Sequence, residues 1–251
     1  MNEVLSSFRP DLFAGQAVLV SGATRGIGLG IAQGFAQLGA SVIATGSNPE
    51  QTSREASTAS GATGSIAFRK LDVRDAGAIR AFISALERLD VLVNCAGIAR
   101  PQTEHDESTY REVMEVNLNS AMWASAAARP LLDDSGGSII NIASMLSYLA
   151  DPAVPAYCAS KTGLLGLTRS LAFAYGPRIR VNAIAPGYHK TEMTKVHWTQ
   201  PDVERTIAER SALKRWGDVD DLVGAAMFLA SPAARFITGT CVAVDGGYSI
   251  G

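Results

Sequence analysis

The sequence predicts an α/β fold, in which a doubly wound parallel sheet of about seven strands carries helices on both faces within a single domain, residues 1–251. Short apolar runs alternate with stretches of helical apolar spacing along the chain, the pattern of such a sheet. The runs are continuously apolar, as in strands buried on both faces. No linker rich in Pro, Gly or Ser and no internal repeat divides the chain, so one domain accounts for it.

Seven apolar runs bounded by turn residues are the expected strands, at 17–20, 42–44, 66–71, 91–93, 139–142, 181–184 and 241–244. Helical spacing occurs at 27–38, 78–86, 110–127, 157–174 and 219–229. Residues 188–216 are the least regular part of the chain and contain two Trp, two His and one Pro. A long loop inside a compact domain is usually functional, which predicts a substrate lid there.

Charge and residue types limit the classes of partner. The chain has 22 Lys and Arg against 24 Asp and Glu, a net charge of −2, without a block of like charge. This balance argues against nucleic acid or an anionic membrane as partner, and it favours a small-molecule substrate. The three histidines, His105, His189 and His197, lack neighbours at ligand spacing, so no metal is predicted.

Cysteine content and hydropathy indicate where the protein works. Three cysteines without a CxxC pair argue against a disulfide framework and favour a reducing cytoplasm. No apolar stretch approaches 18 residues, and residues 1–13 lack the apolar run of a signal peptide. We therefore expect a cytoplasmic protein that does not cross a membrane.

A glycine-rich turn, SGATRGIG at residues 21–28, follows the first expected strand. Gly22 permits a sharp turn, Gly26 lets the backbone approach a pyrophosphate, and Gly28 permits close packing of helix on strand. The free N–H groups at the start of the helix would bind the anion. A turn that needs positive φ is the simpler interpretation. The position of the glycine-rich turn between a strand and a helix nevertheless favours a dinucleotide site of Rossmann type.

The spacing Gly-x3-Gly-x-Gly resembles the TGxxxGxG fingerprint of the short-chain dehydrogenase/reductase family, with Ser21 in place of Thr. Later segments, in the same order as in the family, are Leu71-Asp72-Val73, Asn94-Cys95-Ala96-Gly97 and Pro186-Gly187 with Thr191. The second departs from the family's NNAG at Cys95. The likeness covers residues 12–248. It implies an NAD(P) site formed by Gly22, Thr24, Arg25, Gly26, Ile27, Gly28, Ser47, Asn48, Asp72, Val73, Asn94, Ala96, Gly97, Tyr157, Lys161, Pro186, Gly187, His189 and Thr191.

Tyr157 and Lys161 are four residues apart on an expected helix and so share one face. An ammonium beside a phenol favours the phenolate, so we expect Lys161 to lower the pKa of Tyr157. Alone, such a pair is more often a solvated helix face. Ser144 precedes Tyr157 by 13 residues, as in the family, and Asn117 matches the family's remaining catalytic position. Taken singly, Ser144 would be a turn or cap residue and Asn117 a buried polar residue of a helix.

The resemblance implies an enzyme that transfers a hydride between a nicotinamide and a secondary alcohol or ketone. Tyr157 would be the general acid or base, with Ser144, Lys161 and Asn117 in support. Segments 140–147 and 154–157, and near the end 228–232 and 243–248, resemble members that act on sugar acids and polyols. One alternative is a 3-oxoacyl carrier-protein reductase. An alternative of another class is a catalytically silent regulator that senses the nicotinamide pool, although the presence of Tyr157 and Lys161 argues against it.

The second expected strand ends near Gly46, where NAD-preferring relatives carry an Asp for the ribose 2′-hydroxyl. Without that carboxylate, Arg25, Ser47 and Asn48 can bind a 2′-phosphate, so NADP is predicted as the preferred cofactor and NAD as the alternative. The simpler interpretation is a solvated turn that discriminates little between the two.

The family also implies a homotetramer. One interface would use the helices at 110–127 and 157–174, and the other would use the last strand and helix. The helix at 157–174 carries more apolar surface than one sheet face needs, at Leu164, Leu165, Leu167, Leu171, Ala172 and Ala174. Surplus apolar surface of this kind usually marks a contact.

Overall fold

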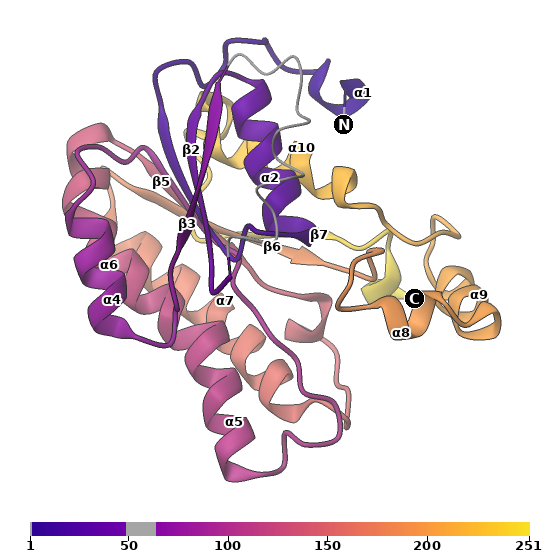
Figure 1. Cartoon of the computed structure of the whole chain (residues 1–251). Coiled ribbons are helices and arrows are strands. Elements are labelled where there is room, and N and C mark those ends of the chain that lie inside the picture. Colours follow the sequence, from indigo (N-terminus) through magenta and orange to yellow (C-terminus); the bar gives the residue numbers. More distant parts are fainter. Residues whose placement is uncertain (1, 49–63) are drawn as a thin grey trace.

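The computed structural model describes residues 2–48 and 64–251, and it confirms the α/β fold class. Seven parallel strands form one sheet in the order β3-β2-β1-β4-β5-β6-β7 (Figure 1). The strands are β1 Ala17–Ser21, β2 Ser41–Gly46, β3 Ser65–Lys70, β4 Val91–Asn94, β5 Ser138–Ile142, β6 Arg180–Pro186 and β7 Cys241–Val244. All seven expected strands are present. Most of them extend slightly further where polar or turn residues continue the pairing, whereas β3 ends at Lys70, one residue before the expected end, and β7 has the expected bounds.

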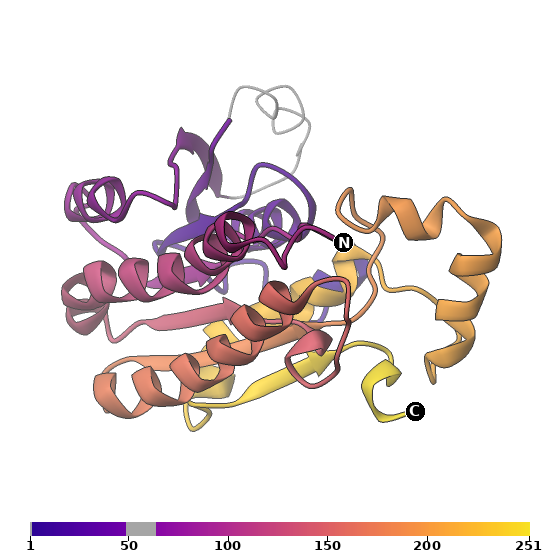
Figure 2. The same cartoon turned by 90° about the horizontal axis from the view of Figure 1, so that it is seen from below.

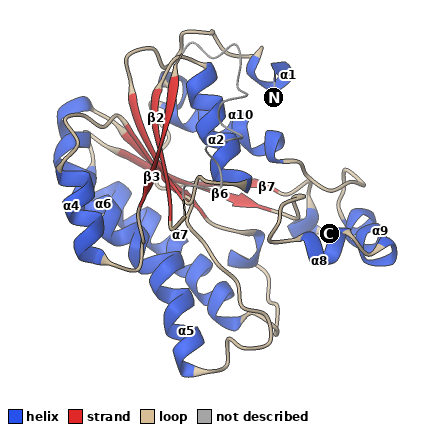
Figure 3. Ribbon diagram, in the orientation of Figure 1, coloured by secondary structure: helices blue, strands red, loops and turns tan. Residues whose placement is uncertain are grey.

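Helices cover both faces of the sheet, as Figure 3 shows. Their bounds are α1 Asn2–Leu5, α2 Gly26–Gln37, α4 Ala76–Ser84, α5 Glu107–Met114, α6 Ser120–Ser135, α7 Pro155–Tyr175, α8 Lys195–Trp198, α9 Pro201–Arg210 and α10 Val219–Ala230. Side chains of β1 alternate between the two cores. Val18 packs in the core that α2 and α10 cover, and Leu19 in the core that α4, α6 and α7 cover.

The helix expected over 110–127 is interrupted, which corrects that prediction. Helix α5 ends at Met114, Glu115–Asn119 forms one π-helical turn, and α6 begins at Ser120. Asn117 lies in this turn, and its side chain hydrogen-bonds the backbone of Ile98. Because apolar spacing continues on both sides of the turn, the sequence pattern does not reveal the break. Single π-turns inside helices are frequent at functional sites.

Residues 188–216 contain the helices α8 and α9, so this segment is folded and is not an irregular loop. Figure 2 shows both helices projecting from the body of the molecule. Two indole N–H groups fasten the segment. Trp198 donates to the carbonyl of Thr191 at 3.0 Å, and Trp216 donates to the carbonyl of Glu204 at 2.9 Å.

The sheet order determines where a ligand can bind. Strand β1 pairs with β2 on one side and with β4 on the other, so the connections run outward in opposite directions from β1. In sheets of this kind, ligands bind outside the carboxyl ends of the strands at such a point. The ends of three central strands are in register there, with Ser21 opposite Asn94 and Asn94 opposite Asn141.

Candidate functional site

A cleft of about 430 Å³ opens at the carboxyl edge of the sheet. Most of the predicted site residues line it, namely Gly22, Thr24, Arg25, Gly26, Ile27, Gly28, Ser47, Asp72, Val73, Ala96, Gly97, Ser144, Tyr157, Lys161, Pro186, Gly187, His189 and Thr191. Asn48, Asn94 and Asn117 are not among the lining residues. The structure therefore brings together segments that follow β1, β2, β3, β4, β5 and β6.

The start of α2 forms one wall and can hold an anion. Gly22 has φ +64°, and a Cβ there would lie 2.6 Å from the Cα of Ala96, so the turn requires glycine. Helix α2 begins at Gly26, with no acidic residue in its first turn and no side-chain cap from any residue of the described chain. Its free N–H groups and the positive end of the helix dipole face the cleft, which fits a pyrophosphate.

Ser21 joins the ends of β1 and β4 beneath this wall. Its hydroxyl accepts hydrogen bonds from the backbone N–H groups of Cys95, at 3.1 Å, and Ala96, at 3.3 Å. Serine has the hydroxyl that the threonine of the fingerprint would place there, so the departure at Ser21 keeps this contact.

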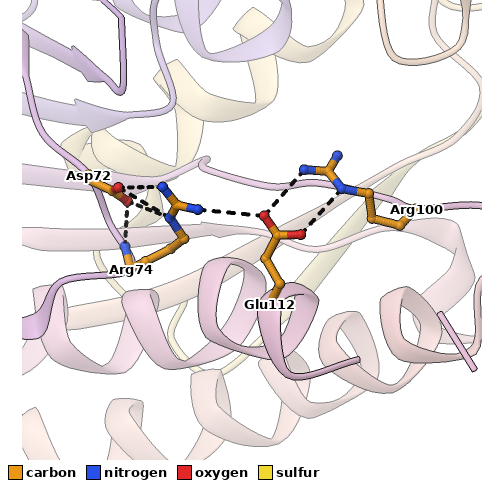
Figure 4. A network of polar contacts seen from close by, with 4 residues as sticks. All are labelled: Asp72, Arg74, Arg100 and Glu112. Atoms are coloured by element: carbon orange, nitrogen blue, oxygen red, sulfur yellow. Dashed lines mark hydrogen bonds and ion pairs between the residues drawn. The ribbon is translucent and has the colours of Figure 1, made fainter. Parts of the chain in front are cut away.

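A chain of alternating charges borders the cleft beyond β3 (Figure 4). The guanidinium of Arg74 meets both oxygens of Asp72, the shorter contact being 2.7 Å, and lowers the pKa of that carboxyl. Arg74 also lies 3.7 Å from Glu112, and Glu112 lies 3.4 Å from Arg100. Asp72 thus comes to the cleft already bound on one side, in a fixed orientation.

The residues expected to bind a 2′-phosphate, unlike Asp72, are not held by ion pairs within the described residues. The guanidinium of Arg25 has no hydrogen bond or ion pair within the described residues, and Ser47 is exposed beside it. Asn48 is exposed and lies outside the cleft lining. A Cβ built on Gly46 would lie 2.6 Å from Cγ2 of Thr24, so any larger residue at this position requires Thr24 to turn.

Ser144, Tyr157 and Lys161 come together at the other end of the cleft. Ser144 follows β5, and its hydroxyl accepts from the N–H of Leu146 at 3.1 Å. Tyr157 lines the cleft with Ser144, whose hydroxyl acts to lower the pKa of the phenol. Lys161 donates to the carbonyl of Ile142 at 2.7 Å, and its Nζ lies 5.6 Å from the centre of the Tyr157 ring.

The electrostatics of this group differ from the expectation. Burial raises the pKa of Tyr157 to about 12, and the hydroxyl of Ser144 opposes the rise without cancelling it. Burial lowers the pKa of Lys161 to about 8. The expected depression of the phenol pKa is therefore wrong for this structure, because desolvation of the phenol raises that pKa more than the neighbouring groups lower it. Tyr157 is nevertheless partly exposed and lines the cleft.

Asn117 is buried behind the cleft wall. Its Oδ1 accepts from the N–H of Ile98 at 2.8 Å, and its Nδ2 donates to the carbonyl of Ile98 at 2.9 Å and to Ser160 Oγ at 3.1 Å. A Cβ on Gly97 would lie 3.4 Å from Nζ of Lys161 and 3.7 Å from Oδ1 of Asn117. Asn117 is therefore a near neighbour of Lys161, although it does not line the cleft.

Two further predicted residues have side chains committed elsewhere. Asn94 is buried in the sheet, where its amide donates to Asn141 at 2.8 Å and to Ser125 at 3.2 Å. His189 is buried with its ring against Gly217, and burial lowers its pKa. Within residues 2–48 and 64–251, no group of three potential ligands is placed to hold a metal ion.

The sequence interpretation missed Arg74, Arg100, Glu112 and Glu104. The first three form the charged border of the cleft, and Glu104 is a buried carboxylate that contacts the backbone N–H of Tyr157. The contacts that join them to other segments span long stretches of sequence, from Arg74 to Glu112 and, over 53 residues, from Glu104 to Tyr157. No local spacing pattern could have found these contacts.

Comparison with known proteins agrees with this geometry. A family model described as Enoyl-(Acyl carrier protein) reductase matches residues 22–249. The chain is 37% identical to gluconate 5-dehydrogenase of Gluconobacter oxydans (strain 621H), covering 96% of this chain and 98% of the relative. It is 39% identical to galactitol 2-dehydrogenase (L-tagatose-forming) of Cereibacter sphaeroides, covering 97% of each. The solved structure of a gluconate 5-dehydrogenase from Burkholderia cenocepacia J2315 in complex with NADP and tartrate matches with TM-score 0.87 and 33% identity, covering 96% of this chain and 98% of that chain.

Proposed function

The chain belongs to the short-chain dehydrogenase/reductase family, and from this premise we propose that it transfers a hydride between NADP and a sugar acid, keto-sugar or polyol. The reacting group is a secondary alcohol in one direction and the matching ketone in the other. The observation that carries the proposal is one cleft with an uncapped helix start at one end and the group Ser144, Tyr157 and Lys161 at the other. The uncapped helix start fits a pyrophosphate, and the group of three side chains fits proton transfer.

The protein residues handle the proton. Tyr157 accepts the proton of the substrate hydroxyl in oxidation and returns it to the carbonyl oxygen in reduction. With a pKa of about 12, its phenol is protonated at neutral pH, which is the form that reduction needs. Ser144 donates a hydrogen bond to the same substrate oxygen and orients it. When bound, the nicotinamide supplies the hydride acceptor or donor.

Lys161 and Asn117 support this transfer. Lys161 holds the ribose next to the nicotinamide, and its charge favours the phenolate as the proton leaves Tyr157. Asn117 Oδ1 is close to Lys161 Nζ behind Gly97. A water held by Asn117 would carry the proton from Lys161 toward solvent.

The substrate class rests on the relatives and on residues of the segment after β6 that line the same cleft as Tyr157. Gluconate, galactitol and tartrate, named in the three matches, all carry several hydroxyl groups. The lid side of the cleft presents polar groups from Thr191, Glu192 and Thr194 beside Met193. Hydroxyl and carboxylate groups of this kind suit a polyhydroxy substrate better than an acyl chain.

The carrier-protein alternative has less support. An acidic carrier needs unpaired cations on the surface, and those of residues 188–216 are engaged. Lys190 pairs with Glu204 at 2.6 Å, and Arg205 pairs with Asp202 at 3.1 Å. Arg210 lies 4.4 Å from the ring centre of Tyr248.

NADP is the proposed cofactor because Arg25 has no competing partner in the described chain and Gly46 leaves no carboxylate beside it. A guanidinium free of ion pairs can bind a 2′-phosphate without first breaking a contact. The NADP in the Burkholderia cenocepacia structure supports the same choice.

The test is a rate assay at 340 nm with NADP(H) and NAD(H) on a panel of polyols, aldonates and keto-sugars. A short 3-oxoacyl thioester is included. We expect turnover with a polyol or sugar acid and a preference for NADP. Turnover confined to the thioester would establish the carrier-protein reductase instead. Tight cofactor binding without turnover of any panel member would establish the regulator.

We also propose a homotetramer, a lid at residues 188–216 and a cytoplasmic location. Exposed aromatic side chains support two interfaces, Phe173 on α7 and Phe236 beside β7, which are 95% and 100% exposed. Four residues expected to supply the α7 interface are buried within the chain, namely Leu164, Leu165, Leu171 and Ala172, whereas Leu167 is half-buried and Ala174 is exposed. Cys95, Cys158 and Cys241 are unpaired, which fits a reducing compartment. No helix in the described part of the chain has the length and apolar character to cross a membrane.

A further inference from the structure

Glu104 is a buried carboxylate outside the cleft lining, and it joins the two segments that carry the cleft walls. It is 1% exposed. Its Oε1 accepts from the backbone N–H of Arg100 at 2.8 Å, and its Oε2 accepts from the backbone N–H of Tyr157 at 2.8 Å. Arg100 belongs to the segment that follows β4, and Tyr157 lies in the first turn of α7.

Helix α7 needs this contact because its own cap is poor. Val154 occupies the N-cap position and makes no side-chain hydrogen bond to the helix, and Pro155 follows it. Valine is among the weakest N-cap residues, so the free N–H groups of the first turn require another acceptor. Glu104 supplies it from a different segment, and its negative charge also meets the positive end of the helix dipole.

Two other contacts join the same pair of segments. The N–H of Gln102 donates to the carbonyl of Ala153 at 2.9 Å, and a ring nitrogen of His105 lies 3.4 Å from the carbonyl of Pro152. Glu104 is the buried member of this set. The segment after β4 and the start of α7 are therefore held together along their length, with the carboxylate at the point nearest Tyr157.

We propose that Glu104 is a positioning residue for proton transfer, whose carboxylate holds the backbone at Tyr157 so that the phenol stays against the cleft, and whose charge disfavours the phenolate. The inference rests on the proposed function. It adds a residue that never touches the substrate and acts through Tyr157.

The charge effect has a defined sign. The ionisable groups that act on Tyr157 are Cys158 on its own helix, Cys95 after β4 and Glu104, and each favours the neutral phenol. Lys161 opposes them from one turn further along α7. A negative charge on Glu104 raises the pKa of Tyr157, so its removal lowers that pKa. In reduction the phenol must be protonated, so kcat falls at high pH as the phenol ionises. This fall is the alkaline limb of the pH profile, and a lower pKa of Tyr157 moves it to lower pH.

The experiment compares Glu104→Gln, Glu104→Asp and the control Glu107→Gln in the full chain. Glu104→Gln removes the charge and sets an amide against one backbone N–H. Glu104→Asp keeps the charge and shortens the reach. Glu107 lies three residues away, is exposed and pairs only with Arg111 among the described residues. The measurements are kcat for reduction by rapid pH jump between pH 8 and about 12.5, a range that brackets the pKa of about 12 of Tyr157, the melting temperature, and hydrogen exchange of the Arg100 and Tyr157 amides.

We expect Glu104→Gln to lower kcat about tenfold through misplacement of the phenol. The alkaline limb of Glu104→Gln lies roughly half a pH unit lower than that of the wild type. Glu104→Asp lowers kcat and speeds exchange of one of the two amides, but it leaves the limb in place. Glu107→Gln changes neither kcat nor the limb.

The inference is overturned if Glu104→Gln melts earlier but keeps the wild-type limb, since that is the result of a purely structural contact. It is also overturned if Glu107→Gln moves the limb equally. If Glu104→Gln does not fold, Glu104→Asp with unchanged kcat and amide exchange overturns it. A wild-type protein without turnover contradicts the proposed function instead, and amide exchange then still measures the contact.

Discussion

The two ends of the cleft are built differently. At the reacting end, Ser144, Lys161 and Asn117 are all buried, and each bonds to the backbone of a neighbouring element. At the nucleotide end, Arg25 and Ser47 are exposed, and no hydrogen bond or ion pair within the described chain restrains the Arg25 guanidinium. Proton transfer depends on groups fixed before the substrate arrives, whereas cofactor choice depends on groups that the ligand itself orders. Substitutions at the two ends should therefore change different quantities.

The largest effect is expected from Tyr157→Phe, which removes one hydroxyl at the reacting end and leaves the ring in place. We expect kcat to fall by about 10² to 10⁴, with the cofactor Kd unchanged, because a positioned general acid contributes about that much. The control is Tyr175→Phe, the same change at a buried position near the end of the same helix, which should retain wild-type kcat. Near-normal kcat in Tyr157→Phe would remove this residue from the mechanism.

The second largest effect is expected from Lys161→Met. This variant tests whether one residue serves both cofactor binding and proton transfer. The proposed ribose contact places Lys161 in both binding and chemistry. We expect kcat to fall and the cofactor Kd to rise by about tenfold or more, as for the loss of hydrogen bonds from a charged group. A variant with lower kcat and an unchanged Kd, measured by cofactor fluorescence, would confine Lys161 to the chemistry.

Cofactor choice should change at the nucleotide end alone. We expect Arg25→Ala to lower kcat/KM for NADP by about tenfold or more, to leave the value for NAD unchanged and to retain kcat. Steady-state kinetics with both cofactors measure this effect. Equal losses with NADP and NAD would show that Arg25 does not distinguish the 2′-phosphate from a hydroxyl.

Gly46→Asp should reverse the preference, because its carboxylate repels a 2′-phosphate and can bind the 2′-hydroxyl. The crowding against Thr24 means that any side chain at position 46 disturbs the turn. Gly46→Ala is the matched control, since it adds the same Cβ without the charge. A reversal seen equally in Gly46→Ala would mean that shape, and not charge, decides the preference.

The smallest effect concerns stability at high pH. The pKa of Lys161 is lowered by burial from its ordinary value of 10.5 to about 8. Between these values the unfolded chain binds more protons than the folded chain, so this group adds stability as pH rises through the window. The melting temperature of the wild type, relative to that of Lys161→Met, should therefore rise between pH 8 and about 10. A constant difference would mean that Lys161 titrates normally.

The sequence predicted the strands and the pairing of Tyr157 with Lys161 from local patterns, and the resemblance to the family added Ser144 and Asn117 as proposed catalytic residues. Continuous apolar runs identified the strands, and the four-residue spacing from Tyr157 to Lys161 has a fixed meaning on any helix. The π-turn at Asn117 was not predictable, because the apolar spacing around it continues as in a regular helix. Glu104 and the chain from Asp72 to Arg100 were missed because their contacts join segments far apart in sequence.

The pKa of Tyr157 was misjudged for a related reason. Sequence spacing identified the nearby ammonium of Lys161, but it could not measure how far burial desolvates the phenol. The groups that act on the phenol come from the residues after β5, from the segment after β4 and from α7, and only the folded chain brings these together. The nucleotide end was predicted as a set of residue types, and the crowding of Gly46 by Thr24 appeared only in three dimensions.

The most direct test of the central claim follows the hydride itself. NADPH carrying deuterium at C4 of the nicotinamide, in both stereochemical forms, is incubated with the wild type, with Tyr157→Phe and with a keto-sugar acid that turns over in the panel. The deuterium content of the alcohol product is then determined by mass spectrometry. We predict that one of the two labelled forms adds one deuterium to the product with the wild type, and that Tyr157→Phe makes little product. A product that carries no deuterium from either form would contradict hydride transfer in this cleft.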